Sequence, residues 1–192
     1  MVTKISGSGT STFGGNVNST NFTGSGASLT GTGVVKQVLN SLTNNKSTYN
    51  TGTTYAGVEI TPLTLSITPA SGSNRIMVNY MVTGEGSTGS AMGFRLYRVV
   101  AGTPTLIGIN SANTDKWNVT FVTPYDPNTD STPQPANYLF VDSPNTTDEV
   151  TYKLHVVATS TSSQAFKLNR STGTPTNVKE ETTSSVTLTE IG

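Results

Sequence analysis

Residues 75–82 read RIMVNYMV, and this stretch decides the fold class of the chain. Its alternating apolar side chains fall on one face of an extended strand: Ile76, Val78, Tyr80 and Val82. Met77 and Met81 fall on the opposite face. The preceding residues 69–74, PASGSN, form a dense turn signal. The stretch therefore predicts a β-strand that is entered from a tight turn.

The same two-residue period recurs along most of the chain. Strands are predicted in LTLSIT (63–68), MGFRLYRVV (92–100), TLIGI (105–109), WNVTFV (117–122), NYLFVD (137–142), VTYKLHVVA (150–158), AFKLN (165–169) and SVTLTEI (185–191). The side chains expected inward are Leu63, Leu65, Ile67, Phe94, Leu96, Val100, Trp117, Val119, Phe121, Val150, Tyr152, Leu154 and Val156. No segment carries a sustained helical stripe, and Gly, Pro, Asn and Ser punctuate the strands. About nine or ten short strands of this kind predict an all-β, antiparallel β-sandwich of the jelly-roll type.

VVKQVLNSL, residues 34–42, is the first dense apolar run of the chain. Its valines are β-branched and favour a strand over a helical turn. Residues 43–54 are polar and predict a loop or an edge strand. The sandwich is accordingly expected to occupy residues 34–192, with residues 1–33 as a separate segment.

The composition excludes several classes of partner and chemistry. The 192 residues include no cysteine, so disulfides and thiolate sites are ruled out. Eleven basic and eleven acidic residues balance without a dense basic patch, which argues against a nucleic-acid partner. No apolar run approaches the roughly 18 residues of a membrane span, and we expect neither membrane insertion nor a cleaved secretion signal.

Catalytic and metal-binding patterns are weak. The single histidine, His155, is expected in the middle of a strand, at a surface or interface rather than in a catalytic triad. Glu180 and Glu181 are neighbours, so a strand would point them to opposite faces. DPNTD, residues 126–130, opens like a Ca²⁺ loop but lacks the glycine and the final carboxylate, so a proline turn is favoured over an irregular Ca²⁺ site. We expect a non-enzyme with no catalytic residues, no metal and no cofactor.

The segment before the predicted sandwich has an unusual composition. Of the 28 residues from Ser6 to Gly33, 23 are Gly, Ser, Thr or Asn, and none is charged. Such a segment buries too little apolar surface to fold alone. Its spaced apolar side chains, however, suit an arm that adds as a strand to a neighbouring subunit, and a flexible linker is the alternative. The residues expected to fill pockets on that neighbour are Phe13, Val17, Phe22 and Leu29.

Aromatic residues outside the predicted core are candidates for contacts with a receptor or a glycan. Trp117 alternates with Val119 and Phe121, so the core is its expected place. Tyr97 and Tyr125 are the better candidates for exposed contacts. A carbohydrate-binding module is therefore one alternative function, whereas a glycan-degrading enzyme lacks a credible carboxylate pair.

Several stretches together resemble a bacteriophage family, the trimeric β-sandwich knobs of head-decoration (cement) proteins and of tail fibres or tailspikes. They are LSITPASGSNRIMVNY (65–80), GFRLYR (93–98), LFVDSPNTTDEVTYKLHV (139–156), KLNRS (167–171) and SSVTLTEIG (184–192), and the likeness extends over residues 34–192. The Gly/Ser/Thr-rich front segment resembles those that precede such knobs. The resemblance implies a homotrimer without catalytic residues.

These expectations combine into one functional hypothesis with a runner-up. Only about 33 residues precede the predicted knob, which leaves little room for a fibre shaft. A trimeric decoration protein on the capsid exterior is favoured, with arms that clasp the major capsid protein and knobs that project outward and help host attachment. The runner-up is a short tail fibre or receptor-binding knob on the tail.

Overall fold

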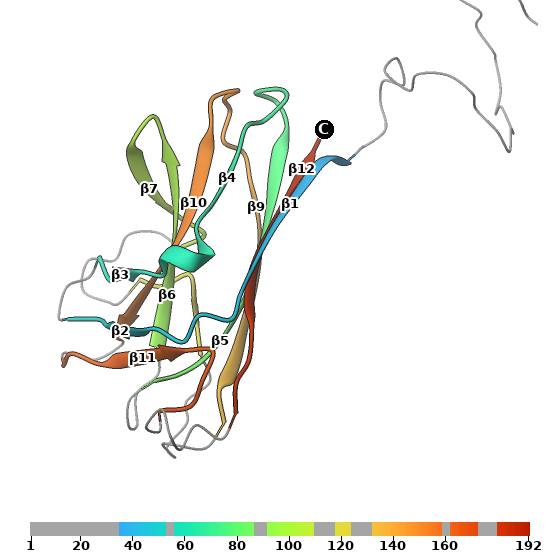
Figure 1. Cartoon of the computed structure of the whole chain (residues 1–192). Helices are drawn as coiled ribbons and strands as arrows, with labels where there is room; N and C mark the ends of the chain where they lie inside the picture. The colour runs from blue at the N-terminus through green and yellow to red at the C-terminus, as the bar shows by residue number, and fades with distance from the viewer. Residues whose placement is uncertain are drawn as a thin grey trace, which may run out of the picture. The chain divides into compact units, whose positions relative to one another are not determined.

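Residues Arg75–Gly86 form β5, a 12-residue strand in which buried and exposed side chains alternate as expected over its first eight residues. The side chains expected inward are buried, whereas Met81 on the other face is 37% exposed. β5 is the central strand of one of the two sheets seen as layers in Figure 1. The computed structural model describes residues 35–52, 56–86, 92–109, 118–123, 132–158, 162–172 and 180–192.

In the described residues each of the two sheets contains six antiparallel strands, and the first is called sheet A. β12 and β9 lie on either side of β5, and β1 pairs with β12 at the edge. β11 pairs with the last residues of β5, on the same side of β5 as β12, and β2 pairs with β11. The bounds of these strands are β1 Val35–Thr43, β2 Thr48–Asn50, β9 Gln134–Asp142, β11 Ala165–Leu168 and β12 Ser184–Ile191.

The second sheet, called sheet B, also contains six antiparallel strands. β10 and β6 pair along their whole lengths in its centre. β3 and β4 share the outer side of β10, while β7 and β8 share the outer side of β6. The bounds are β3 Val58–Glu59, β4 Leu65–Ile67, β6 Met92–Val100, β7 Thr103–Ile107, β8 Phe121–Val122 and β10 Val150–Ala158, with a 3-10 turn, η2, at Thr61–Leu63.

The pairing is that of a long hairpin folded over on itself. β1 and β2 pair with β12 and β11, β3 and β4 pair with β10, β5 pairs with β9, and β6 pairs with β7 and β8. The chain thus visits eight strand positions, and each early position pairs with a late one. This nested pairing across two sheets is the topology of a jelly roll, which confirms the predicted fold class.

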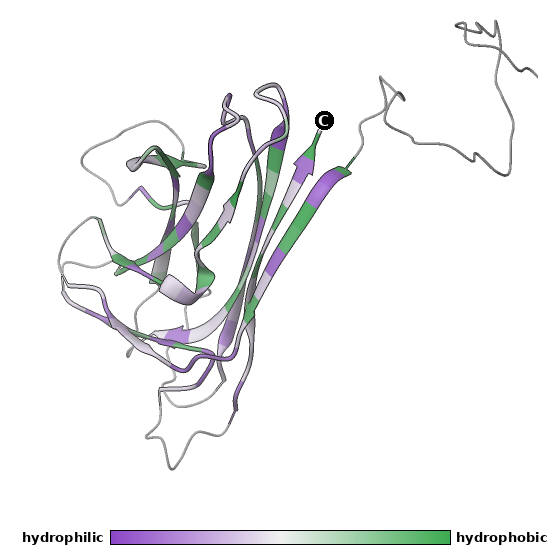
Figure 2. Cartoon of the chain, turned by 45° about the horizontal axis from the view of Figure 1, so that its top comes forward, coloured by the Kyte–Doolittle hydropathy of each residue, from purple (hydrophilic) through white to green (hydrophobic). Residues whose placement is uncertain are grey.

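The core lies between the two sheets and draws on both. Apolar and polar residues alternate along the strands, which Figure 2 shows as green segments between purple and white ones. The inward positions of β10 are all buried, as the sequence pattern predicts, and Phe94 packs against the rings of Phe121 and Phe166. Burying these side chains supplies the main stabilisation, at roughly 1.5–3 kcal/mol for each large apolar group.

A polar bridge connects the two sheets. Asp142 on β9 of sheet A is 5% exposed, and both of its carboxylate oxygens accept hydrogen bonds from Arg98 Nη1 on β6, at 2.9 and 3.2 Å. Tyr152 on β10 donates its hydroxyl to Asp142 Oδ2 at 2.8 Å. The buried carboxylate is therefore both paired and hydrogen-bonded, as a charge in the interior requires.

A second buried carboxylate holds the turn before β5. Glu190 on β12 has no exposed surface. Its oxygens accept hydrogen bonds from the Ala70 amide, from Asn74 Nδ2 and from Gln37 Nε2, at 2.7, 2.5 and 2.6 Å. Desolvation raises the pKa of this carboxyl, but the hydrogen bonds outweigh it and the net pKa is lowered below the ordinary 4.5. The turn of residues 69–74 is thus tied to the edge of sheet A.

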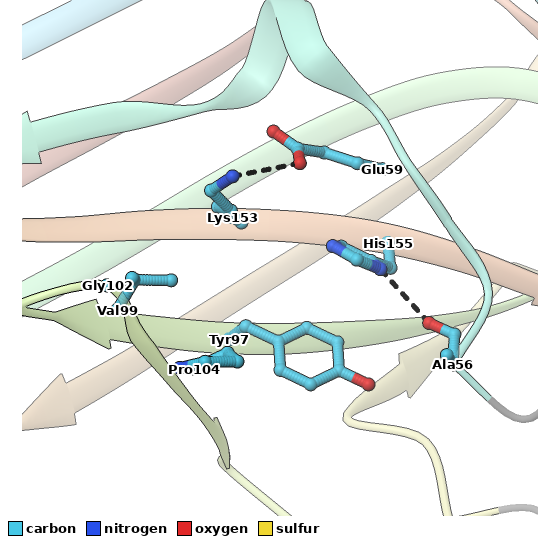
Figure 3. Close-up of a pocket in the computed structure, with 8 residues that line it drawn as sticks. All are labelled: Ala56, Glu59, Tyr97, Val99, Gly102, Pro104, Lys153 and His155. Atoms are coloured by element: carbon cyan, nitrogen blue, oxygen red, sulfur yellow. Dashed lines mark hydrogen bonds and ion pairs between the residues drawn. The ribbon is translucent and has the colours of Figure 1, made fainter.

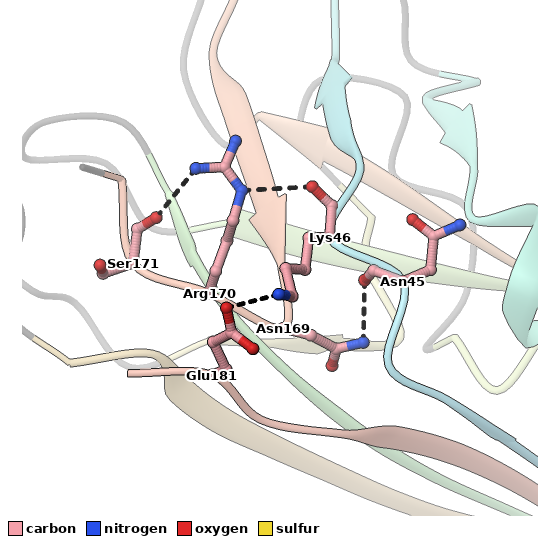
Figure 4. Close-up of polar contacts among 6 residues, drawn as sticks. All are labelled: Asn45, Lys46, Asn169, Arg170, Ser171 and Glu181. Atoms are coloured by element: carbon pink, nitrogen blue, oxygen red, sulfur yellow. Dashed lines mark hydrogen bonds and ion pairs between the residues drawn. The ribbon is translucent and has the colours of Figure 1, made fainter. Parts of the chain in front are cut away.

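Polar contacts also fix the corner between β1 and β2 against the end of β11 (Figure 4). Asn169 Nδ2 donates to the carbonyl oxygens of Thr43 and Asn45, each at 3.0 Å. Arg170 Nε donates to the Lys46 carbonyl at 3.2 Å, and the Lys46 ammonium pairs with Glu181. Asn169 has a positive φ of 57°, a conformation that asparagine tolerates better than most residues. These contacts hold the corner of residues 43–46 against the residues that follow β11.

One glycine in sheet A is required by close packing. At Gly84 of β5, a Cβ atom would collide with the carbonyl oxygen of Lys167 and with the ring of Phe166. β11 pairs with β5 at this point, so only a residue without a side chain allows the two backbones to approach.

The structure differs from the sequence expectations in local detail. It contains twelve strands in the described residues rather than nine or ten, because some positions in the sheets are occupied by two short strands. For example, β3 and β4 both pair with the longer β10. Leu63 is buried but lies in the 3-10 turn, where Pro62 fixes a helical φ, rather than in a strand. The turn before β7 is made by Ala101 and Gly102, both with positive φ, so Pro104 lies inside the edge strand. Val35–Thr43 belongs to sheet A.

Candidate functional site

The outer face of sheet A carries the largest group of exposed apolar side chains in the described residues. Its centre is a register-matched block of four strands, residues 38–42, 77–81, 137–141 and 185–189. We call the exposed large apolar side chains of this block, together with Val35 beside it, the apolar face: Val35, Val38, Leu42, Met81, Leu139 and Val141. They are between 37% and 65% exposed, and Val122 of sheet B is the only other large apolar residue exposed in this way in the described chain.

None of the twenty residues in this block is charged. The exposed positions between the apolar side chains hold asparagine, such as Asn40, Asn79 and Asn137. With three interstrand spacings of about 4.8 Å and four rises of about 3.4 Å, the block measures about 14 Å in each direction between backbone atoms. An uncharged apolar surface of this kind is typical of the centre of a protein–protein interface.

The sequence does not predict this surface, although it contains one signal for it. Met77 and Met81 were placed behind the inward row of β5, which already gave that strand apolar residues on both faces. The run LFV at 139–141 has the same property. Apolar residues on both faces of a strand are typical of strands that are covered on both faces. The alignment of the four strands could not be read from the sequence because it depends on their order in the sheet.

The outer face of sheet B has a different chemistry and contains a groove (Figure 3). The groove has a volume of about 330 Å³. It lies over the central pair β10 and β6, where Lys153 is paired in register with Tyr97, and Glu59 of β3 is paired with His155. Its lining is formed by Ala56, Glu59, Tyr97, Val99, Gly102, Pro104, Lys153 and His155.

Tyr97 and His155 form the aromatic part of the groove. Their ring centroids are 4.6 Å apart with the planes tilted by 51°. His155 Nδ1 lies 3.0 Å from the Ala56 carbonyl oxygen. Because a carbonyl only accepts, Nδ1 carries the proton and Nε2 of the neutral ring is left as an acceptor. No other described residue bonds to this nitrogen or to the Tyr97 hydroxyl.

The ionisation of His155 is set by its surroundings. Burial lowers its pKa below the ordinary 6.5, and the nearby cations Lys153 and Arg95 lower it further. The hydrogen bond to Ala56 and the negative charge of Glu59 act in the opposite direction but do not outweigh burial. His155 is therefore neutral at pH 7.

Glu59 and Lys153 form the polar side of the groove, opposite Tyr97 in Figure 3. Lys153 Nζ lies 3.0 Å from Glu59 Oε2, and Thr64 Oγ1 donates to Glu59 Oε1 at 2.8 Å. Desolvation raises the pKa of Glu59, but the hydrogen bonds from Thr64 and Lys153 and the nearby positive charges lower it below 4.5 overall. The pair is ionised and balanced in charge, and both side chains are about one third exposed or less.

A second hollow adjoins the groove and shares Val99 and Gly102 with it. It has a volume of about 340 Å³ and is completed by Ala101, Asp148, Glu149 and Thr151. Together the two hollows make an elongated depression with a neutral end and an acidic end.

The structure brings only one of the site residues predicted from sequence into a site. Tyr97 lines the groove, half-buried rather than fully exposed. Tyr125, Trp117, the loop 126–130 and the arm residues Phe13, Val17, Phe22 and Leu29 lie outside the described residues, so those predictions remain predictions. His155, expected at a surface or interface, lies on the outer face of sheet B.

In the described part of the chain, no three His, Cys, Asp or Glu side chains gather as metal ligands. Within the same residues, no helix is long and apolar enough to cross a membrane. Among the residues that line the groove, the cation is Lys153, which is paired with Glu59, while Arg95 lies beside His155 and is mostly buried. The groove therefore offers aromatic stacking and neutral hydrogen bonding.

No protein-family model matches the chain, and no curated protein matches it. Among solved structures, the chain is similar to the VP2 subviral particle of infectious bursal disease virus, with 12% sequence identity and a TM-score of 0.39. The match covers 81% of this chain and 40% of that chain, so this chain spans about two fifths of the VP2 chain. A likeness at this TM-score carries no argument about function, which rests here on the chain's own residues.

Proposed function

We propose that this chain is a non-enzymatic structural protein of a virion, a homotrimeric decoration (cement) protein on the capsid exterior. The observation that carries the proposal is the apolar face of sheet A. A decoration protein works through permanent contacts, and permanent interfaces are more apolar than ordinary surface. The resemblance of residues 34–192 to phage knobs gives the proposal its virion setting.

Other copies of this chain are the proposed occupants of the apolar face. In a trimer with threefold symmetry each copy presents two different parts of its surface to its two neighbours, and parts without charge meet without like-charge repulsion. The block is smaller than the roughly 800 Å² that each partner contributes to a standard interface, so it supplies the centre and neighbouring residues supply the rim. The second proposed contact joins the arm of residues 1–33 to the major capsid protein.

The first test is the oligomeric state of the purified full chain, measured by sedimentation equilibrium. We expect a trimer whose association weakens at least about 100-fold in the double variant Val38→Lys, Leu139→Lys, because two ammonium groups would be buried without partners. Val122→Lys is the matched control, since Val122 is 50% exposed and lies on sheet B. A monomeric wild-type chain, or a double variant that stays trimeric, would contradict the proposal.

The second test locates the protein on the particle. Quantitative mass spectrometry of purified virions should find a copy number comparable to that of the major capsid protein. A handful of copies would instead support a short tail fibre. A truncated chain lacking residues 1–33 should still form trimers but lose binding to capsid shells, and unchanged shell binding would contradict the role of the arm.

A further inference from the structure

The groove on sheet B has the features of a ligand site rather than of an interface. Its floor is aromatic and aliphatic, from Tyr97, Val99 and Pro104, and the Glu59–Lys153 pair lies on the side opposite Tyr97. Its volume falls at the lower end of the range of about 300–1,000 Å³ that is typical of small-ligand pockets. By contrast, the block at the centre of the apolar face of sheet A contains no charged residue.

The hydrogen-bonding groups suit hydroxyls. His155 Nε2 and the carboxylate of Glu59 accept hydrogen bonds, and the Tyr97 hydroxyl donates or accepts one. Lys153 provides a donor next to the Glu59 acceptor. A row of adjacent donors and acceptors beside an aromatic ring matches a molecule with an apolar face and hydroxyl groups around its edge.

The charges of the depression select a neutral ligand. Lys153 is neutralised by Glu59, and His155 is neutral at pH 7 because burial lowers its pKa. The adjoining hollow contains the exposed carboxylates Asp148 and Glu149. Phosphates, acidic sugars and nucleotides would meet this negative charge, and the cation among the residues that line the groove, Lys153, is already paired with Glu59. Arg95 lies beside His155 but is only 7% exposed and donates Nε to the Asn118 carbonyl.

We propose that this depression binds a neutral oligosaccharide, with one pyranose ring stacked on Tyr97 and the next sugar in the hollow beside Asp148 and Glu149. The apolar C–H face of the pyranose lies against the Tyr97 ring, where aromatic surface is exposed. Its hydroxyls reach the acceptors of Glu59 and His155. Because two hollows adjoin, the proposed ligand contains at least two sugar units. This proposal goes beyond the structural role of sheet A and does not depend on it.

The test uses the purified full chain and a panel of neutral disaccharides, lactose, maltose, cellobiose and chitobiose, in saturation-transfer NMR titrations. We expect saturable binding of at least one of them. Tyr97→Ala should weaken that binding about tenfold, and Tyr97→Phe should retain most of it because the ring remains. Glu59→Gln should weaken it while leaving the fold in place. Val122→Ala is the control and should leave binding unchanged, because Val122 is exposed on β8 of the same sheet but does not line the groove.

Sialyllactose tests the requirement for neutrality against lactose, which differs from it by one acidic sugar. Weaker binding of sialyllactose than of lactose is expected. The proposal is overturned if no disaccharide binds saturably at high millimolar concentration, if Tyr97→Ala and Glu59→Gln both bind like the wild type, or if the acidic sugar binds more tightly. Thermal unfolding of each variant shows that the loss comes from the groove rather than from misfolding.

Discussion

The outer faces of the two sheets of this sandwich have opposite characters. On sheet A, exposed valine, leucine and methionine side chains surround asparagine and threonine in a block without a charged residue. On sheet B, Glu59, Lys153 and His155 surround a tyrosine in a groove. The carboxylates differ in the same sense, because Asp142 and Glu190 of sheet A are buried, whereas Glu59 of sheet B faces outward.

This difference bears on which outer face is suited to permanent contact with water. A buried carboxylate is costly unless every oxygen is satisfied, and sheet A satisfies Asp142 and Glu190 while leaving apolar groups outside. Such a distribution is unfavourable for a sheet that faces water permanently. Sheet B has the ordinary distribution for a hydrated surface. We therefore expect sheet A to be covered by protein and sheet B to remain open to ligands.

The largest expected effect on stability separates a buried carboxylate of sheet A from a surface carboxylate of sheet B. Glu190→Ala should reduce the free energy of unfolding by about 3 kcal/mol, because the donors from Ala70, Asn74 and Gln37 all lose their acceptor. Glu59→Ala should cost less than about 1 kcal/mol, since its ion pair is partly hydrated. Urea unfolding of both variants measures the difference. Equal losses of unfolding free energy would contradict the distinction between the buried and the surface carboxylate.

A smaller effect distinguishes two buried tyrosines, one on each sheet. Tyr152→Phe should reduce the free energy of unfolding by about 1–1.5 kcal/mol, because its hydroxyl donates to Asp142. Burial and the neighbouring Asp142 raise the pKa of Tyr152, so this hydroxyl stays protonated throughout the working pH range.

Tyr80→Phe is the matched control for this change. Tyr80 is equally buried, but its hydroxyl has no hydrogen-bond partner among the described residues. Its removal should therefore leave stability unchanged or raise it by up to about 1 kcal/mol. The two variants are compared by calorimetry, and a loss in Tyr80→Phe as large as that in Tyr152→Phe would reveal a partner for Tyr80.

The smallest expected effect is a dependence of the free energy of unfolding on pH. His155 of sheet B and Glu190 of sheet A contribute to it in different pH ranges. The pKa of His155 is lowered in the folded protein, so the unfolded chain takes up this proton first and stability falls as the pH drops through about 6.5. The pKa of Glu190 is also lowered, so its contribution is present above about pH 4.5 and is lost as the pH falls below that value.

Unfolding free energies measured from pH 8 to pH 3 check this assignment. His155→Gln should flatten the decline near neutrality and leave the acidic decline in place. Glu190→Gln should flatten much of the acidic decline, with the remainder carried by Glu59 and other carboxylates. A decline near neutrality that persists in His155→Gln would contradict the role given to sheet B.

Much of the fold could be predicted because its signal is local. The alternation in residues 75–82 and 150–158 identified the buried side chains of β5 and β10 directly. It could not place Leu63 in a 3-10 turn, because Leu63 continues the alternation of Leu65 and Ile67 and the proline that fixes the turn, Pro62, stands just before that pattern. It could not show that Pro104 lies in a strand either, since an edge strand tolerates the missing donor.

The candidate sites were less predictable because their residues come from distant parts of the chain. Tyr97 was singled out from sequence, but Glu59, Lys153 and His155 join it only through the pairing of β10 with β3 and β6. Val38 and Leu139, although each lies in a predicted strand, share a face only because β12 and β5 lie between their strands.

The sequence by itself determined the β class, the inward faces of the main strands, and the absence of thiol chemistry. The first two properties follow from neighbouring residues, whose side chains alternate along an extended backbone, and the third follows from the lack of cysteine. Only the tertiary structure decided which strands are adjacent. That order brings uncharged residues of four strands into one apolar face and gathers a tyrosine, a histidine and an ion pair in one groove. Strand order depends on contacts between residues far apart in the chain, and no local pattern specifies them.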